Sequence, residues 1–287
     1  MEKICFTNTK EQLLFDAVLF FRPTINFNII KTALRKKDIK VNGQKIKENI
    51  ILNIGDKIEL FIKNKENKKI ETIFEDKNVL IVFKPAGVET TTRDKVFENS
   101  ESLEELTNAK ACHRLDKNTE GLVVLAKNYE SENCLIDAFK EHKIKKEYIA
   151  IVGGKIDKNG ENFEDFVKKE QNFVKICSKN DKNAKIAKLS YIPISSKNNL
   201  SLLKINLETG RTHQIRVQLS HHGIFVLGDE KYGDKEINKK YHKKKQLLCS
   251  TKITFEKLDT PLQYLTGKSF KINPSFDLQN FDIKSRT

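Results

Sequence analysis

A run of polar side chains stands directly before an apolar segment near the middle of the chain. Residues 112–121 include His113, Arg114 and Asp116, and the apolar run of residues 122–126 follows at once. Functional groups are often carried on a loop that a rigid element holds in place, so Asp116 is a candidate catalytic acid. The alternative is that Asp116 begins an Asx turn while Arg114 forms a surface ion pair. Taken alone, the segment favours this alternative.

A second polar cluster, residues 208–216, lies at a predicted junction between a strand and a helix. It contains Arg211, His213 and Arg216. The start of a helix presents free backbone amides and a favourable dipole to phosphate, and Arg suits bidentate contact with carboxylate or phosphate. The cluster therefore indicates an anion site, against the alternative of an ordinary helix cap with a solvated face. A third segment, residues 227–233, is by itself only a turn.

The segments that must position these side chains are mostly strands. Continuous or alternating apolar runs predict strands at residues 70–75, 79–83, 122–126, 148–152, 189–194 and 202–207. Helical spacing predicts helices over residues 130–142 and 212–222, the second of them closed by Gly223. The run at residues 122–126 is apolar throughout, which is typical of a central strand buried on both faces.

The N-terminal part of the chain has a different pattern. It predicts two helices, a hairpin around Asn42-Gly43 and a strand, at residues 13–21, 26–37, 39–46 and 57–62. Arg35 and Lys36 fall on the outer side of the second helix. Residues 63–69 are polar and unpatterned, as in a linker. We therefore expect two domains, residues 1–63 and residues 70–287.

The composition favours a polyanionic partner. Lys and Arg number 53 against 39 Asp and Glu, which gives a formal net charge of +14. Each phosphate that a protein neutralises releases condensed counterions, so such an excess favours binding to nucleic acid. The alternative is that many of these lysines only solvate the surface.

Cysteine usage and hydropathy indicate the compartment. The five cysteines are scattered and never spaced as Cys-x-x-Cys, which argues against a disulfide framework and against a structural zinc site. No basic N-terminal segment precedes a cleavable apolar stretch, and no apolar run approaches the roughly 18 residues of a membrane span. We expect a soluble, cytoplasmic protein.

In combination, these motifs resemble the RluA family of RNA pseudouridine synthases. The family's His-Arg-Leu-Asp pattern, its Lys-x-Tyr-x-Ala-x-Val, its Gly-Arg-Thr-His-Gln-Ile-Arg-Val and its Gly-Asp-x-x-Tyr-Gly fit residues 113–127, 146–152, 210–217 and 228–233. Lys84-Pro85-Ala86-Gly87 is similar to a family loop that precedes the active site. The resemblance covers roughly residues 70–257, and several motifs in the family order are far more specific than one.

The resemblance implies an α+β fold with a mixed, largely antiparallel sheet and flanking helices. The N-terminal residues are similar to a small helix-helix-strand RNA-binding module, first seen in a ribosomal protein and often attached to these enzymes. This module would contact RNA through residues such as Arg35 and Lys36.

The implied activity is the isomerisation of uridine to pseudouridine in a structured RNA. This reaction breaks the N1–C1′ bond of a uridine, turns the freed uracil and rejoins it through C5. Asp116 would either attack C1′ or remove the C2′ proton. Arg216 would be the ionic partner of Asp116, and Tyr148 would stack on the uracil and serve in proton transfer at C5.

A uridine in folded RNA is stacked, so the enzyme must flip it out. By resemblance, Arg114 and His113 would fill the space that the base leaves, since a guanidinium plane can stand in for a base. Further RNA contacts are expected from Arg211, His213 and Lys84, and a base pocket is expected from Ile215 and Leu227.

The implied reaction needs neither a metal nor a redox cofactor, so we expect no cofactor and no metal ligand. The expected partner is structured RNA, with large-subunit ribosomal RNA favoured and transfer RNA as the alternative, and the protein is expected to be a monomer. Four positions depart from the family pattern: Glu120, Gln218, Phe225 and Cys249. Gln218, for example, stands where the family often has His.

Two other classes of function compete with this interpretation. An RNA-binding or ribosome-assembly factor would explain the charge and the N-terminal module, but gives no reason to keep Asp116, Tyr148 and Arg216 together. A different RNA-modifying enzyme fits less well, because the His-x-Glu and Pro-Cys-x-x-Cys of zinc deaminases and the Gly-rich loop of nucleotide-cofactor enzymes are missing from the sequence.

Overall fold

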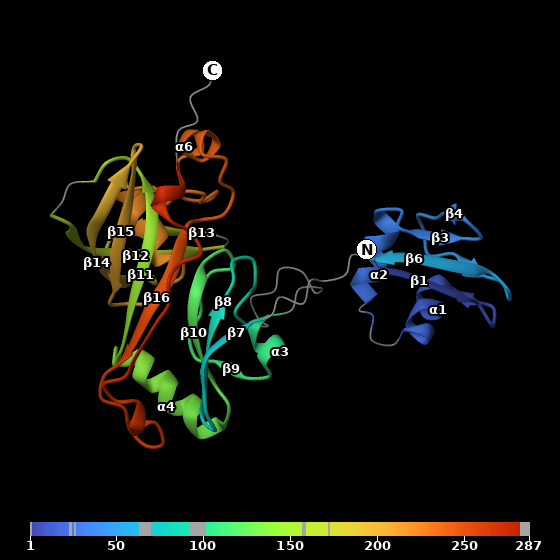
Figure 1. The fold of residues 1–287 in the computed structure, drawn as a ribbon, viewed down its shortest axis with the longest axis horizontal. Coiled ribbons are helices and arrows are strands. Elements are labelled where there is room, and N and C mark those ends of the chain that lie inside the picture. Colours follow the sequence, from blue (N-terminus) through green and yellow to red (C-terminus); the bar gives the residue numbers. More distant parts are fainter. Residues whose placement is uncertain are drawn as a thin grey trace. The chain divides into compact units, whose positions relative to one another are not determined.

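The computed structural model of the protein describes residues 2–22, 25, 27–62, 70–91, 102–156, 159–171 and 173–281. These residues belong to two units, an N-terminal one within residues 1–69 and a larger one that begins at Ile70 (Figure 1). Each unit has its own apolar core and is described separately.

The N-terminal unit packs two helices against a small antiparallel sheet in the strand order β1-β6-β3-β4. Asn42 and Gly43 both have positive φ, 48° and 80°, as a tight hairpin turn between β3 and β4 requires. In chain order its elements are β1 (Glu2–Thr7), β2 (Gln12–Leu13), α1 (Leu14–Phe21), α2 (Phe27–Arg35), β3 (Ile39–Val41), β4 (Gln44–Lys45), β5 (Ile51–Leu52) and β6 (Lys57–Ile62).

The larger unit is built on one long sheet. In the described residues its strand order is β13-β12-β14-β15-β11-β16-β10-β8-β7, with β17 added to β16 and β9 to β10. All neighbours are antiparallel except β10 and β16. The strands are β7 (Glu71–Glu75), β8 (Val79–Lys84), β9 (Lys110–Ala111), β10 (Glu120–Ala126), β11 (Ile144–Gly153), β12 (Glu161–Glu170), β13 (Phe173–Cys177), β14 (Lys185–Lys197), β15 (Leu200–Leu207), β16 (Leu248–Phe255) and β17 (Ser269–Lys271).

Short helices flank this sheet and help to close its two faces. They are α3 (Leu103–Thr107), α4 (Tyr129–Lys140), α5 (Gln214–His221) and α6 (Lys235–Lys240), with single 3-10 turns η2 (Gln263–Leu265) and η3 (Leu278–Asn280). Leu122 and Val124 of β10 pack with Leu135 of α4, whereas Val123 and Leu125 face the cluster that contains Ile215 of α5. The α+β architecture predicted from the sequence is therefore confirmed.

Strand β10 is buried along its whole length, as its apolar sequence predicts. Its second residue, Gly121, has φ of +121°, and a Cβ atom there would lie 2.3 Å from the carbonyl oxygen of Ser250 on β16. Only glycine permits this approach, which carries the chain from the polar loop into the centre of the sheet.

Parts of the prediction need correction. The helix expected at residues 212–222 begins at Gln214, because His213 adopts a left-handed φ of 53° and lies outside it. Strands β1, β12, β13 and β16 were not predicted, although β1 lies against β6 along its full length and β16 pairs with both β10 and β11.

Candidate active site

Polar residues from three parts of the larger unit surround an open cavity of about 430 Å³. They come from the loop before β10, from the α4–β11 region, and from the segment between β15 and α5 together with α5 itself. The lining residues are Cys112, His113, Arg114, Leu115, Asp116, Thr119, Ile136, Phe139, Lys140, His142, Lys146, Tyr148, Leu207, Gly210, Arg211, Thr212, His213, Gln214, Ile215, Arg216 and Leu248.

The loop that carries Asp116 is anchored from behind by the chain after β8. The Lys84 ammonium is fully buried and donates hydrogen bonds to the carbonyl oxygens of Pro85, Val88 and Lys117, at 3.2, 2.8 and 3.1 Å. Thr90 Oγ1 accepts from the Leu115 N–H at 3.1 Å and donates to the Leu115 carbonyl at 2.9 Å. The residues on both sides of Asp116 are thus held, and its side chain is not needed for the turn.

The prediction that Lys84 contacts RNA is wrong, because its ammonium has no exposed surface. Lys84 instead positions the loop of Asp116 through the Lys117 carbonyl. We expect Lys84→Met to lower the free energy of unfolding by about 2 kcal/mol, since it leaves buried carbonyl groups without their donor. Chemical denaturation measures this change, and an unaltered midpoint would contradict the anchoring role. Lys77→Met, on an exposed loop, is the control.

The centre of the site is Arg216, whose guanidinium group lies between two carboxylates. Its Nη1 donates to Asp116 Oδ2 at 2.7 Å, while Nε and Nη2 donate to the two oxygens of Asp229 at 2.6 and 2.8 Å. The Asp229 side chain is 1% exposed and that of Asp116 is 16% exposed. Asp229 therefore fixes the orientation of the forked guanidinium group of Arg216. The remaining nitrogen of that group, Nη1, binds Asp116, the carboxylate that faces the cavity.

The charges of this group reinforce one another. Burial lowers the pKa of Arg216, but its hydrogen bonds to Asp229 and the charge of Asp116 raise that pKa above its usual value. Burial raises the pKa of Asp229, yet the hydrogen bond and charge of Arg216 hold it below its ordinary 3.8. The Arg216–Asp229 pair therefore stays ionised at neutral pH.

Tyr148 enters the cavity from the centre of the sheet. It follows a β-bulge in the pairing of β11 with β16, and such a bulge re-aims the side chain beside it. The residue is 4% exposed. Burial raises the pKa of its phenol above the usual value, and the charge of Asp116 adds to this effect. The side chain is therefore a neutral phenol at physiological pH.

His113 and Arg114 differ in their surroundings, although they are neighbours. His113 Nε2 accepts a hydrogen bond of 2.9 Å from the backbone N–H of Val124, and its ring lies 4.6 Å from that of Phe139. Burial and the charge of Lys146 lower the pKa of His113 to about 3, so the ring is neutral. Arg114 is exposed at the rim of the cavity. The geometry thus favours Arg114 over His113 for contact with RNA.

The two basic residues before α5, Arg211 and His213, also contact different neighbours. His213 Nε2 is 4.0 Å from Asp116 Oδ1, and its Nδ1 shares a hydrogen bond of 2.9 Å with the hydroxyl of Tyr232. Burial lowers the pKa of His213, although the charge of Asp116 opposes this shift. Arg211 Nε donates to the Ile186 carbonyl at 3.0 Å, which holds the side chain near the start of β14.

Of the two residues predicted to form the base pocket, the structure places only Ile215 on the cavity. Leu227 is 1% exposed and packs with Ile151, Leu200 and Phe281 in a separate cluster. The prediction for Leu227 is wrong because Leu227 lies in the turn that the Asp229 N–H closes on the Val226 carbonyl, and its side chain packs in that separate cluster. Its neighbour Val226 faces the cluster of Tyr148 instead.

Sequence reasoning missed two residues of this site. Asp229 was only part of a turn in the sequence, because nothing local shows that its carboxylate receives both arms of the Arg216 fork. Lys146 was recognised only as the first residue of the Lys-x-Tyr-x-Ala-x-Val motif, and no role was assigned to it. It lines the cavity, and in the described residues its ammonium makes no ion pair or hydrogen bond. Burial lowers the pKa of Lys146 from 10.5 to about 8.

In the N-terminal unit, Arg35 ends α2 and Lys36 follows it, and both side chains are exposed. None of the helices that the structure describes combines the length and the apolar character that a membrane span requires.

One open cavity is lined by a carboxylate, its guanidinium partner, a phenol and several cations. This arrangement defines an enzyme that acts on polyanionic substrates. Comparison with known proteins identifies the family. Residues 78–221 match the family model described as RNA pseudouridylate synthase. The chain belongs to this family, as a pseudouridine synthase of the RluA type that acts on RNA, so the predicted enzyme class is confirmed.

Two relatives illustrate the similarity. The "Ribosomal large subunit pseudouridine synthase C" of Rickettsia felis is 37% identical over 244 residues, which cover 75% of this chain and 79% of the relative. An "Uncharacterized RNA pseudouridine synthase" of Mycoplasma capricolum is 30% identical and covers 94% of this chain and 96% of its own length. The structure of human RNA pseudouridylate synthase domain containing 1 shares the fold, with a TM-score of 0.58 at 19% identity over 75% of this chain and 86% of that one.

Proposed function

We propose that the protein isomerises a uridine of large-subunit ribosomal RNA and that Asp116 is the carboxylate that reacts at the ribose. The observation that carries this proposal is the hydrogen bond of 2.7 Å between Arg216 and Asp116 at the cavity wall. It supports a carboxylate that the guanidinium of Arg216 holds in a fixed orientation before the substrate arrives. Both roles of Asp116, attack on C1′ and removal of the C2′ proton, agree with this geometry.

Tyr148 would contact the flipped uracil. Its raised pKa opposes a role as the base that removes the C5 proton, because the phenol keeps its own proton. A neutral phenol can pack against the base and donate one hydrogen bond to it. The pKa direction therefore favours a stacking and orienting role for Tyr148, with Ile215 beside it on the cavity wall.

The cations of the cavity support an extended RNA substrate. Lys146, Arg114 and Arg211 lie around the carboxylate, and a phosphate is the counterion that an RNA brings to such positions. Of these cations, Lys146 is the best candidate for binding a phosphate, because it has no carboxylate partner in the described part of the chain. We propose that it binds a backbone phosphate near the flipped uridine.

We expect Lys146→Gln to weaken RNA binding about tenfold at pH 7, equivalent to about 1.4 kcal/mol. The charged form of Lys146 is lost as pH rises through about 8, so wild-type affinity should fall between pH 7 and pH 9. The variant should lack this part of the pH dependence. Fluorescence anisotropy with labelled RNA measures both effects, and Lys145→Gln, on the exposed neighbour, is the control. Equal pH profiles for wild type and Lys146→Gln would contradict the contact.

Ribosomal RNA is proposed over transfer RNA because relatives of similar length carry the name of large-subunit enzymes. The exposed Arg35 and Lys36 support a second RNA contact by the N-terminal unit. All five cysteines are free, which agrees with a reducing compartment such as the cytoplasm.

The test is a map of pseudouridine in ribosomal and transfer RNA from cells in which the gene is deleted. Complementation with the wild-type gene should restore the lost positions, and these should lie in large-subunit ribosomal RNA. Loss only in transfer RNA would contradict the proposed substrate. Loss at no position would favour an RNA-binding factor without turnover.

A further inference from the structure

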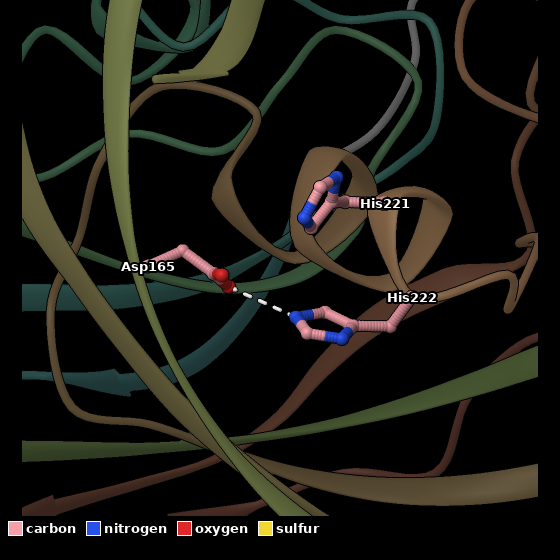
Figure 2. A group of neighbouring side chains, drawn as sticks. All are labelled: Asp165, His221 and His222. Carbon is pink, nitrogen blue, oxygen red and sulfur yellow. Dashed lines mark hydrogen bonds and ion pairs between the residues drawn. The ribbon is translucent and has the colours of Figure 1, made fainter. Parts of the chain in front are cut away.

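A second polar cluster lies at the end of α5, outside the cavity (Figure 2). It consists of Asp165 on β12, His221 at the last position of α5, and His222, which caps that helix. One oxygen or nitrogen atom from each residue lies within 4.8 Å of the other two. The sequence carries no spacing signal for this group, because Asp165 is distant from the two histidines along the chain.

Two of these three side chains are held in place by their neighbours. The ring of His222 stacks on Phe163, with centroids 3.7 Å apart and planes at 10°. Its Nε2 is 3.2 Å from Asp165 Oδ2, which also accepts a hydrogen bond of 2.8 Å from Gln218 Nε2. The Asp165 side chain is only 12% exposed. The positions of His222 and Asp165 are therefore set before any ligand binds.

Other lone pairs of the cluster are unused. In the part of the chain that the structure describes, neither Asp165 Oδ1 nor the ring nitrogens of His221 take part in a hydrogen bond or ion pair. Figure 2 shows His221 on the last turn of α5, above the Asp165–His222 pair. Two imidazoles and one carboxylate, open to solvent on one side, form a donor set that suits a divalent transition metal ion.

We propose that Asp165, His221 and His222 bind a divalent transition metal ion, for which Zn²⁺ is the probe. Zinc bonds of about 2.0–2.2 Å place tetrahedral ligand atoms roughly 3.3 Å apart. The Asp165–His222 separation of 3.2 Å already has this value, so only His221 must move closer. His222 would coordinate through Nε2 with its proton on Nδ1, and water would take the fourth position.

Such an ion would brace the helix that carries Arg216. Asp165 accepts from Gln218, whose Oε1 accepts from Gln214 Nε2 at 2.9 Å. Gln214 Oε1 in turn accepts from the Arg211 backbone N–H at 2.9 Å. This chain of side chains runs along α5 from the metal site to the loop at the cavity. It depends on Gln218, the position at which the family often has His.

The test uses the full-length protein and Zn²⁺ alone, with isothermal titration calorimetry and thermal unfolding. We expect one ion of micromolar or tighter affinity whose binding is weakened at least about tenfold in His221→Asn and in Asp165→Asn, and a wild-type Tm that rises with Zn²⁺. His221 is exposed, and the amide oxygen introduced by Asp165→Asn can still accept the hydrogen bond from Gln218. Both variants should therefore fold, as circular dichroism checks.

His242→Asn, which removes an exposed histidine elsewhere, is the matched control and should bind as wild type does. Free thiols are also zinc ligands, and a thiol site would bind Zn²⁺ equally in wild type and in both variants. That result would overturn the proposal. So would the absence of binding at micromolar Zn²⁺. Neither readout depends on pseudouridine formation, so the outcome is independent of the proposed RNA substrate.

Discussion

Asp116→Asn is expected to lower the rate of pseudouridine formation by about 10³- to 10⁴-fold while RNA binding stays within about threefold of wild type. The amide has the size of the carboxylate and can still accept from Arg216 Nη1, but it neither attacks C1′ effectively nor removes a proton. Single-turnover assays with excess enzyme measure the chemical step, and filter binding measures affinity.

Asp137→Asn is the matched control, because Asp137 lies on the exposed side of α4 with a side chain that is 64% exposed. Asp137 does not line the cavity, so this variant removes the same charge outside the site and should leave the rate unchanged. If Asp116→Asn kept more than about a tenth of the wild-type rate, the catalytic role would have to pass to another group of the cavity.

Arg216→Met is expected to lower the free energy of unfolding by about 3–5 kcal/mol and to abolish activity. The substitution leaves Asp229, at 1% exposure, as a buried carboxylate without its counterion. The backbone N–H groups of Lys231 and Tyr232 still donate to Asp229, but they do not replace the two charged hydrogen bonds. Urea denaturation followed by circular dichroism measures the loss.

The double variant Arg216→Met with Asp229→Asn separates stability from catalysis. It removes both buried charges, and the amide oxygen introduced by Asp229→Asn can still accept from the backbone groups of Lys231 and Tyr232. We expect it to regain most of the lost stability and none of the activity, because Asp116 still lacks its partner. Recovery of activity in the double variant would show that Arg216 acts only through the fold.

The pH dependence of this pair follows from the lowered pKa of Asp229. A carboxylate whose pKa is depressed in the folded state contributes stability that is present above its ordinary 3.8 and is lost as pH falls through the folded value. The contribution is therefore complete at neutral pH. The stability difference between wild type and the double variant should shrink only in strong acid.

Of the strands beside the site, β10 was predicted from the sequence and β16 was not. Strand β10 was recognisable because both of its faces are buried, which makes every position apolar or small after its first residue. Strand β1 was not, because its signal is limited to the inward side chains of Ile4 and Phe6, and its partner β6 lies far along the chain.

For the site itself, the sequence indicated which segments meet. It did not indicate which side chains are buried and which of them contact one another. Lys84 was assigned to RNA by resemblance to the family, and only the fold shows it buried among carbonyl groups. Leu227 was assigned to the base pocket, but it lies in a turn and its side chain packs in a separate cluster. Asp229, and the pairing of Asp165 with His222, depend on contacts between distant segments that no local pattern encodes.

The contacts of the Arg216 guanidinium group affect how the reaction rate depends on salt concentration. All three of its hydrogen-bonding nitrogens are directed at protein carboxylates, so dissolved ions have little access to them. The cations at the rim, such as Arg114, are exposed, so salt screens their attraction to phosphates, most strongly beyond the Debye length of about 8 Å at physiological ionic strength. Added salt should therefore raise the RNA concentration needed for half-maximal rate and leave the maximal rate nearly constant. The molecule separates the charges that capture its substrate from the charges that transform it.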